Sequence, residues 1–248
     1  GEMKILITND DGIDSYGLKL LESLAKTLTN NVTTVAPRDN RSGTSQAISL
    51  QEELYFSNVS ANRYICSGNP ADCVMLALNL LFKDNPPDLV LSGINHGMNA
   101  SDDVGYSGTV GAAREASIVG IRAIAFSQRY GKLESDFEVA RKFGKKVLDN
   151  ALSIKLPPRH VLNVNFPSVD ISKVRGIQAA VLDSHKMSDQ IFASKNPNFY
   201  SIGPINQRLE TNPKSDRFYL ENGYVTFTPL LIDTTAMDLM KKIPNFTL

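Results

Sequence analysis

The sequence has no excess of charge of either sign. Lysine and arginine together number 26, and aspartate and glutamate also number 26, so the formal net charge is zero. A protein that neutralises the phosphates of a nucleic-acid duplex needs an excess of basic residues, so we expect no duplex binding. A small local site for an anion is still compatible with this balance.

Cysteine and long apolar runs are also scarce. The two cysteines, Cys66 and Cys73, form no Cys-x-x-Cys pair and have no histidine cluster nearby, which argues against a disulfide framework or a zinc site. No stretch approaches about 18 consecutive apolar residues, so we predict no membrane span. The first residues lack the basic region and apolar run of a secretory signal peptide. We therefore expect a cytoplasmic protein with reduced thiols.

The first two thirds of the 248 residues alternate between short apolar runs and amphipathic segments, which predicts an α/β fold with a mostly parallel sheet flanked by helices. The predicted strands are Lys4–Thr8, Val32–Ala36, Leu54–Phe56, Tyr64–Cys66, Asp88–Leu91, Ile121–Phe126 and Val161–Phe166. The predicted helices are Tyr16–Leu28, Pro70–Phe82, Thr109–Ser117 and Phe137–Leu152.

The pattern changes after about residue 168. Lys173–Leu182 and Tyr224–Leu231 alternate as half-exposed strands do, the intervening segment is polar, and Asp233–Lys242 is a candidate terminal helix. We therefore predict a core over residues 3–168 that carries the active site, and a smaller β-rich extension with a C-terminal arm over residues 169–248.

Polar clusters follow the predicted strands, at the sheet edge where open parallel sheets bind ligands. Asp10 and Asp11 come directly after the first strand. Two adjacent carboxylates repel each other unless a positive charge lies between them, and a hard divalent cation with oxygen ligands would supply it. The alternative is that either residue only caps the following helix or stabilises the turn.

Two further clusters offer neutral oxygens. The Ser42 hydroxyl beside Gly43 could complete a metal's ligand sphere or bind a phosphoryl oxygen, although such pairs also occur in ordinary loops. Asn95 and Asn99 carry amide oxygens that suit Mg²⁺, Mn²⁺ or Ca²⁺, with turn formation as the alternative. His96 is the histidine nearest to these clusters, and a lone histidine is more often hydrogen-bonded than catalytic.

The stretch Gly105–Gly111 opens a predicted helix of small residues. Free amides at a helix N-terminus, together with the helix dipole, form an anion site, whereas an ordinary N-cap is the alternative. No Gly-Lys-Ser/Thr ends the stretch, so it is not a P-loop. Two carboxylates, a hydroxyl, an amide oxygen and a phosphate cradle at one edge predict a metal-assisted phosphoester site.

These motifs together resemble the SurE family, the stationary-phase survival proteins that act as metal-dependent 5′/3′-nucleotidases. The matching stretches, in family order, are Ile5–Gly12, Ala36–Gly43, Gly68–Val74, Ser92–Asn99, Tyr106–Ala113 and Gly223–Leu230. The resemblance implies a Rossmann-like core and hydrolysis of nucleoside 5′- and 3′-monophosphates to nucleoside and phosphate, with polyphosphate as a side substrate. It also implies dimers or tetramers in which the C-terminal part reaches across subunits.

The resemblance assigns roles to individual residues. It implies one divalent cation, Mg²⁺ or Mn²⁺, on Asp10, Asp11, Ser42 and Asn95, with Asp10 and Asp11 as the catalytic pair. It places phosphate contacts on Gly43, Asn99, Ser107, Gly108 and Thr109. Whether water attacks phosphorus directly, or one aspartate forms a phosphoenzyme first, stays open.

One segment departs from the family pattern, and two other functional classes match part of the sequence. Asn196–Gly203 reads N-P-N-F-Y-S-I-G where a Tyr-Trp pair is expected, and the chain has no tryptophan. A response-regulator receiver also has an acid pair after its first strand. It needs an aspartate where this chain has Asn95, and a lysine where it has Ser127-Gln128-Arg129. A nucleotide sensor without turnover is the third class.

Overall fold

The computed structural model describes residues 1–186, 188–204 and 211–247. The strands of the first part are β1 (Ile5–Thr8), β2 (Val32–Pro37), β3 (Phe56–Ser60), β4 (Arg63–Cys66), β5 (Leu89–His96), β6 (Arg122–Gln128) and β7 (His160–Phe166). The later strands are β8 (Gly176–Ala179), β9 (Ser188–Ala193), β10 (Tyr200–Pro204) and β11 (Tyr224–Leu231).

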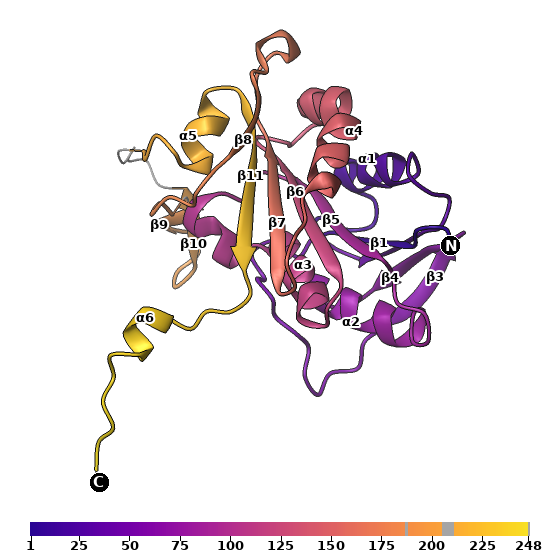
Figure 1. Cartoon of the computed structure of the whole chain (residues 1–248), viewed down its shortest axis with the longest axis horizontal. Helices are drawn as coiled ribbons and strands as arrows, with labels where there is room; N and C mark the ends of the chain where they lie inside the picture. The colour runs from indigo at the N-terminus through magenta and orange to yellow at the C-terminus, as the bar shows by residue number, and fades with distance from the viewer. Residues whose placement is uncertain (187, 205–210, 248) are drawn as a thin grey trace.

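Within these residues, nine strands form one sheet in the order β3-β4-β2-β1-β5-β6-β7-β11-β8 (Figure 1). The strands from β4 to β7 run parallel to one another, whereas β3 and β11 are antiparallel to β4 and β7. The predicted α/β fold with a mostly parallel sheet is therefore confirmed.

Four longer helices cover the two faces of the sheet. The helices α1 (Tyr16–Ala25) and α4 (Glu138–Ser153) pack on one face, and α2 (Pro70–Leu80) and α3 (Gly108–Ile118) pack on the other. The shorter helices are η1 (Ser101–Tyr106), η2 (Glu134–Phe137), η3 (Ile171–Lys173), α5 (Asp216–Glu221) and α6 (Met237–Met240). No helix in the described ranges has the length and apolar character needed to cross a membrane.

The strand order reverses between β1 and β5, which are neighbours in the sheet. From β1 the chain crosses through α1 to β2, whereas from β5 it crosses through α3 to β6 on the opposite face. The two connections diverge, so they leave a crevice outside the carboxyl ends of these strands, which is where open α/β sheets bind ligands.

The strand β5 is longer than the sequence predicts. It continues past Leu91 to His96, with a register shift between Ser92 and Asn95, and its last residues still pair with β6. Glycine and asparagine are rare in strands, so the sequence favours a loop here. Burial between neighbouring strands overrides that preference, and Asn95 sits on the strand end rather than in a loop.

Three helices are shorter than predicted. The helix α2 ends at Leu80 rather than Phe82. The helix α1 ends at Ala25 rather than Leu28, because the Thr27 hydroxyl donates to the Leu24 carbonyl at 2.6 Å and competes with the helical pattern. The terminal helix is only the single turn α6, because Asp233 is bound by Arg159 and no residue of α6 is buried.

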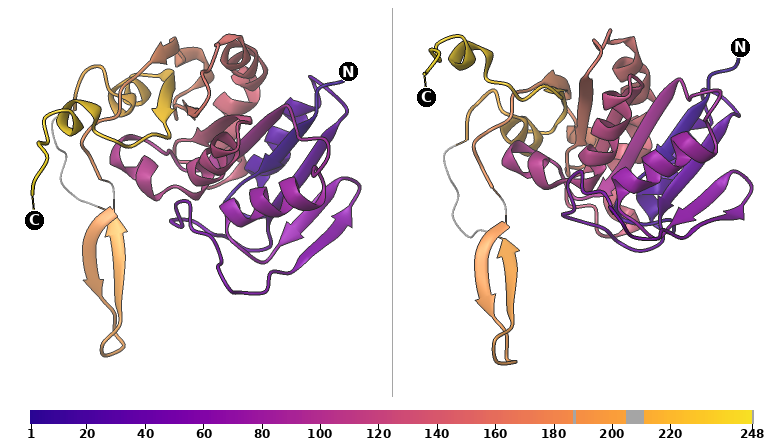
Figure 2. Two further views of the ribbon diagram at one scale, coloured as in Figure 1. Left: turned by 60° about the horizontal axis from the view of Figure 1, so that its bottom comes forward. Right: turned by 90° about the horizontal axis from the view of Figure 1, so that it is seen from below.

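The second part of the chain contributes to the same sheet and also extends beyond it. The strands β11 and β8 join the sheet next to β7, whereas β9 and β10 pair only with each other, as a hairpin that projects from the body (Figure 2). The chain from α6 onward also runs away from the body. The division into two domains at residue 168 stays a prediction.

Candidate functional site

The turn after β1 is folded by the side chain of Asn9. Its Nδ2 donates to the Gly12 carbonyl at 2.9 Å and to the Ser15 hydroxyl at 2.8 Å, while its Oδ1 accepts from the Gly12 amide. Gly12 has φ of 106°, which favours glycine. This tight turn places Asp10 and Asp11 at the crevice.

Asp10 is removed from water, and Asp11 is half-buried. Asp10 is 3% exposed, and its Oδ1 is buried with no hydrogen-bond partner among the described residues. Burial raises the pKa of Asp10 to about 7, and the charge of Asp11 adds to this rise, whereas Thr109 opposes it. Burial also raises the pKa of Asp11, whose Oδ2 accepts from the His96 amide at 3.0 Å. Two carboxylates in such surroundings need a compensating positive charge to ionise together.

The end of β5 brings Asn95 to the same place. Its Nδ2 donates to the Gly97 carbonyl at 2.8 Å, which leaves the amide oxygen to the crevice. The adjacent His96 also lines the cavity, and its ring is held in place because its Nε2 accepts from the Gly17 amide at 3.1 Å and the ring packs on Phe137. Burial lowers the pKa of His96.

The loop after β2 closes one side of the crevice. The Arg41 amide donates to the Asp10 carbonyl at 2.6 Å and so ties this loop to the turn after β1. Ser42 lies exposed at the mouth, and its hydroxyl donates to Asn40 Oδ1 at 2.6 Å. Because that bond uses the proton, the lone pairs of the Ser42 oxygen remain available to a ligand.

The N-terminus of α3 lies against Asp10. Ser107 caps the helix by accepting from the Val110 amide at 3.0 Å. A Cβ on Gly108 would lie 3.1 Å from Cβ of Asp10, so only glycine fits here without displacing a neighbour. The first amides of this helix have no partner within it, and they therefore present partial positive charge beside the carboxylates.

The loop that joins β5 to α3 is anchored by the C-terminal part of the chain. The amide and hydroxyl of Ser101 donate to the Asp216 carboxylate at 2.9 and 3.0 Å. Asp216 is fully buried and is the first residue of α5. The sequence segment that carries Asp216 showed no functional pattern, so its contribution to the site could not be predicted.

A cavity of about 730 Å³ occupies this edge of the sheet. The predicted residues that line it are Asp10, Ser42, Gly43, Asn95, Asn99 and Ser107. Asp11, Gly108 and Thr109 lie behind this lining, close to Asp10. The lining residues that the sequence analysis missed include Asp103, Tyr106, Lys186, Ile191 and Ile202. The last two come from the projecting hairpin, which no pattern connects to the strand ends.

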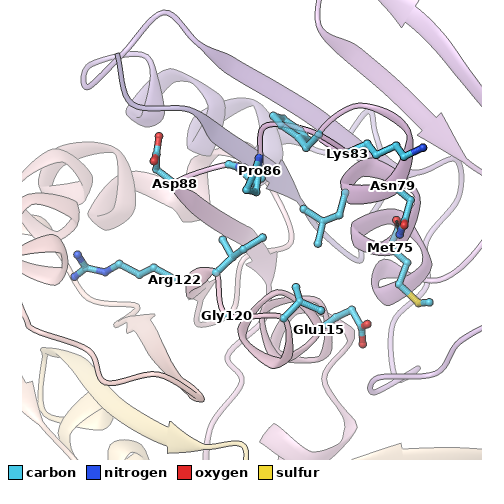
Figure 3. A pocket seen from close by; sticks show the side chains of 13 residues that line it. Met75, Asn79, Lys83, Pro86, Asp88, Glu115, Gly120 and Arg122 are labelled. Carbon is cyan, nitrogen blue, oxygen red and sulfur yellow. Dashed lines mark hydrogen bonds between the residues drawn. The ribbon is translucent and has the colours of Figure 1, made fainter. Parts of the chain in front are cut away.

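A second hollow, of about 690 Å³, lies at the opposite end of the sheet (Figure 3). It sits between α2 and α3 where β5 and β6 begin, and Met75, Lys83, Glu115 and Arg122 are among the residues that line it. It contains none of the predicted site residues. The predicted site residues therefore gather at the carboxyl ends of the strands and not at this second hollow.

The fold, and the cavity at the carboxyl ends of the strands, define an α/β protein with its ligand site at the switch point of a mostly parallel sheet. The family model described as "Survival protein SurE" matches residues 5–189. The chain therefore belongs to the SurE family, and the resemblance noted in its motifs is confirmed.

Individual relatives match almost end to end. The 5′-nucleotidase SurE of Vibrio parahaemolyticus is 38% identical over 247 residues, which cover 98% of this chain and 94% of that protein. The protein of the same name from Campylobacter jejuni subsp. jejuni is 40% identical over 252 residues, covering 98% and 97%. The crystal structure of the SurE protein from Aquifex aeolicus has a TM-score of 0.85 at 34% identity, covering 97% of this chain and 98% of that one.

Proposed function

We propose that this chain is a metal-dependent phosphomonoesterase that hydrolyses nucleoside 5′- and 3′-monophosphates to nucleoside and phosphate, with short polyphosphate as a further substrate. The relatives named 5′-nucleotidase support the reaction class. The observation that carries the proposal is the buried carboxylate oxygen of Asp10, which has no hydrogen-bond partner among the described residues and lies beside Asp11 and the N-terminus of α3. A cation site and a phosphate site would thus share one wall.

A divalent cation fits the donors present. Among residues 1–186, 188–204 and 211–247, no group of three His, Cys, Asp or Glu side chains could hold a metal ion, so neutral oxygens must complete any site. Asp10, Asp11, Ser42 and Asn95 would hold one Mg²⁺ or Mn²⁺ per subunit, because all four offer the hard oxygen ligands that these ions prefer. When bound, the cation would offset phosphoryl charge and lower the pKa of water.

The protein's own groups would bind and orient the phosphate. The hydroxyls and amides of Ser107 and Thr109, with the amide of Gly108, form the start of α3, where an anion is stabilised. Gly43 lines the same cavity. Asn99 donates one Nδ2 hydrogen to Ser127 and keeps the other for a phosphate oxygen.

The cavity also has room for a nucleoside. Its outer wall is formed by Tyr106, Ile191 and Ile202, which are 50%, 60% and 72% exposed. Lys186 lies over the Tyr106 ring, with its Nζ 5.3 Å from the ring centre. This apolar wall with one aromatic face suits a base and a ribose, whereas inorganic phosphate alone would leave it uncovered.

For the chemical step we favour direct attack of water. One of the two aspartates accepts a proton from the water, the water oxygen bonds to phosphorus, and the ester bond breaks as the nucleoside oxygen takes up that proton. In a single turnover with ³²P-labelled substrate that is quenched in acid, no label should stay on the protein. Label on the protein that hydroxylamine releases would instead show an aspartyl-phosphate intermediate.

Release of phosphate from a panel of 5′- and 3′-monophosphates and short polyphosphate tests the function. We expect release with Mg²⁺ or Mn²⁺, and EDTA should abolish it. If the chain binds AMP but releases no phosphate with any metal, it is a nucleotide sensor and the proposal fails. A cytoplasmic location stays a prediction from the sequence.

A further inference from the structure

The face of the sheet that α3 covers changes from apolar to polar toward the carboxyl ends of β6 and β7. Along β6, Ala125 is followed two residues later by Ser127, and along β7, Val161 is followed by Asn163 and Asn165. The three polar residues are all 0% exposed. Burying a polar side chain costs free energy unless it is hydrogen-bonded, so the hydrogen-bond partners of these three residues indicate their role.

Their partners belong to one residue, Asn99. The Asn99 amide donates to Oδ1 of Asn165 at 2.9 Å, and the Asn99 carbonyl accepts from Nδ2 of Asn163 at 2.8 Å and of Asn165 at 3.0 Å. The Asn99 side chain donates through Nδ2 to the Ser127 hydroxyl at 2.8 Å. Side chains of the sheet thus replace the backbone partners that a residue outside a helix or strand lacks.

These contacts fix both the position and the rotation of the Asn99 carboxamide. Asn99 is 7% exposed and lines the cavity that Asp10 also lines. In the structure Nδ2, rather than Oδ1, points to the sheet and donates to the Ser127 hydroxyl, so its second hydrogen is left for another acceptor. Ser127, Asn163 and Asn165 themselves are not among the residues that line the cavity.

We propose that Ser127, Asn163 and Asn165 are positioning residues of the phosphate site, which hold Asn99 so that its carboxamide meets the phosphate of a nucleoside monophosphate. This inference rests on the proposed function and deepens it. The three residues touch no substrate and act only through Asn99. Ser127 acts through the Asn99 side chain, and Asn163 and Asn165 act through the Asn99 backbone.

A double-mutant cycle between Ser127 and Asn99 tests this dependence. Ser127→Ala removes one buried hydroxyl and should lower kcat/KM for AMP about tenfold, whereas Ser127→Thr, which keeps the hydroxyl, should retain most of it. In an Asn99→Ala background, adding Ser127→Ala should cost nothing further. A purely structural role would instead make the two losses multiply, and would not be rescued selectively by threonine.

The matched control is Thr226→Val. Thr226 is fully buried, lies opposite Asn165 in the neighbouring strand, and its hydroxyl has no partner among the described residues. This change removes a hydroxyl from the same layer without touching Asn99, so kcat/KM should stay within about twofold of wild type. Thermal melting of each variant shows whether it folds, and Asn165→Leu is added as a stronger variant if it does.

The outcomes separate this inference from the proposed function. If wild type releases phosphate from AMP but the losses multiply, or Asn99→Ala has no effect, the positioning role is wrong while the function stands. If wild type releases no phosphate from any monophosphate, the function is wrong, and the same cycle is measured on the dissociation constant of AMP. Independent effects on that constant would also overturn the positioning role.

Discussion

At the scale of single residues, the aspartate pair combines burial with unmet charge. Asp10 keeps a buried oxygen that has no hydrogen-bond partner in the part of the chain that the structure describes, and Asp11 accepts from the His96 amide. In a side chain that serves only as a helix cap or a turn former, the oxygens accept hydrogen bonds from nearby amides. The Oδ1 of Asp10 accepts none of these, so the geometry favours a cation ligand over a helix cap or turn former.

Replacing either aspartate should remove nearly all turnover while the fold survives. Asp10→Ala or Asp11→Ala removes a group that stabilises transition-state charge, a loss of about 3 kcal/mol or more. Phosphate release from AMP with saturating Mn²⁺ measures it, with thermal melting as the check on folding. Asp14→Ala is the control, because Asp14 is exposed in the same turn. A variant with more than a tenth of wild-type rate, about 1.4 kcal/mol, contradicts the assignment.

The raised pKa of Asp10 predicts a pH dependence of stability in the absence of metal. The folded chain holds a proton on Asp10 up to about pH 7, whereas the unfolded chain loses it near the ordinary value of 3.8. The stabilisation is therefore complete below about pH 4 and is lost as the pH rises through 7. Urea unfolding in EDTA should show a smaller free energy at pH 8 than at pH 5.

Two comparisons test the origin of that dependence. Asp10→Asn cannot ionise, so the contribution of this residue should vanish in the variant, and an unchanged pH dependence would rule Asp10 out as the cause. Adding Mn²⁺ at pH 8 should raise the free energy of unfolding of the wild-type protein, because a ligand that binds only the folded state stabilises that state. The same addition should raise the free energy of unfolding of Asp10→Asn far less.

At the scale of elements, the contact between α3 and the turn after β1 sets the distance between the two halves of the site. A Cβ on Gly108 would lie 3.0 Å from the Thr44 hydroxyl and 3.1 Å from Cβ of Asp10. Gly108→Ala should therefore shift the helix start and lower kcat/KM for AMP about tenfold, although alanine favours helices by about 1 kcal/mol. Gly105→Ala, with nothing within 4 Å, is the control. Equal activity of both variants would contradict this account.

The elements themselves were largely predictable because their patterns are local. The strands β1 and β2 and the helices α2 and α4 follow directly from apolar periodicity and from Pro70 at a helix start. The last part of β5 was not predictable, because its Gly and Asn residues favour turns and only the neighbouring strands hold them extended. Local preference was overridden by tertiary pairing there.

The site was predictable to the extent that it depends on strand ends. Asp10, Ser42 and Asn95 could be grouped because the carboxyl ends of parallel strands share one edge. Lys186 and Asp216 could not, because they reach the site from a segment whose path no periodicity fixes. The buried Asn163 looked like any strand residue, since its partner is 64 residues away.

At the scale of the whole molecule, two parts expose apolar side chains that the body does not cover. On the hairpin these are Ile191, Phe192, Phe199, Tyr200 and Ile202, and on the C-terminal tail they are Met237, Leu239, Met240, Ile243 and Phe246. Exposed apolar groups concentrated on projecting segments mark interaction surfaces. We therefore propose self-association as a dimer or a tetramer.

Light scattering of the purified chain tests this assembly. Wild type should have the mass of a dimer or tetramer, and the double substitution Leu239→Asp with Ile243→Asp should lower it, because charges would be buried at the contact. Leu50→Asp is the control, since Leu50 is 74% exposed on a loop outside both segments. A wild-type monomer at micromolar concentration would contradict the proposal.

The bond between Asp216 and Ser101 has a consequence for the order in which a functional molecule is made. All the residues predicted to bind the cation or the phosphate lie in the first 109 residues, so they are translated early. The hydrogen bond from Ser101 to Asp216 can form only after residue 216 has been translated, and β11 pairs with β7 later still. A nascent chain that is stalled before that point would carry every ligand yet lack a finished crevice, so catalytic competence should arise near the end of translation.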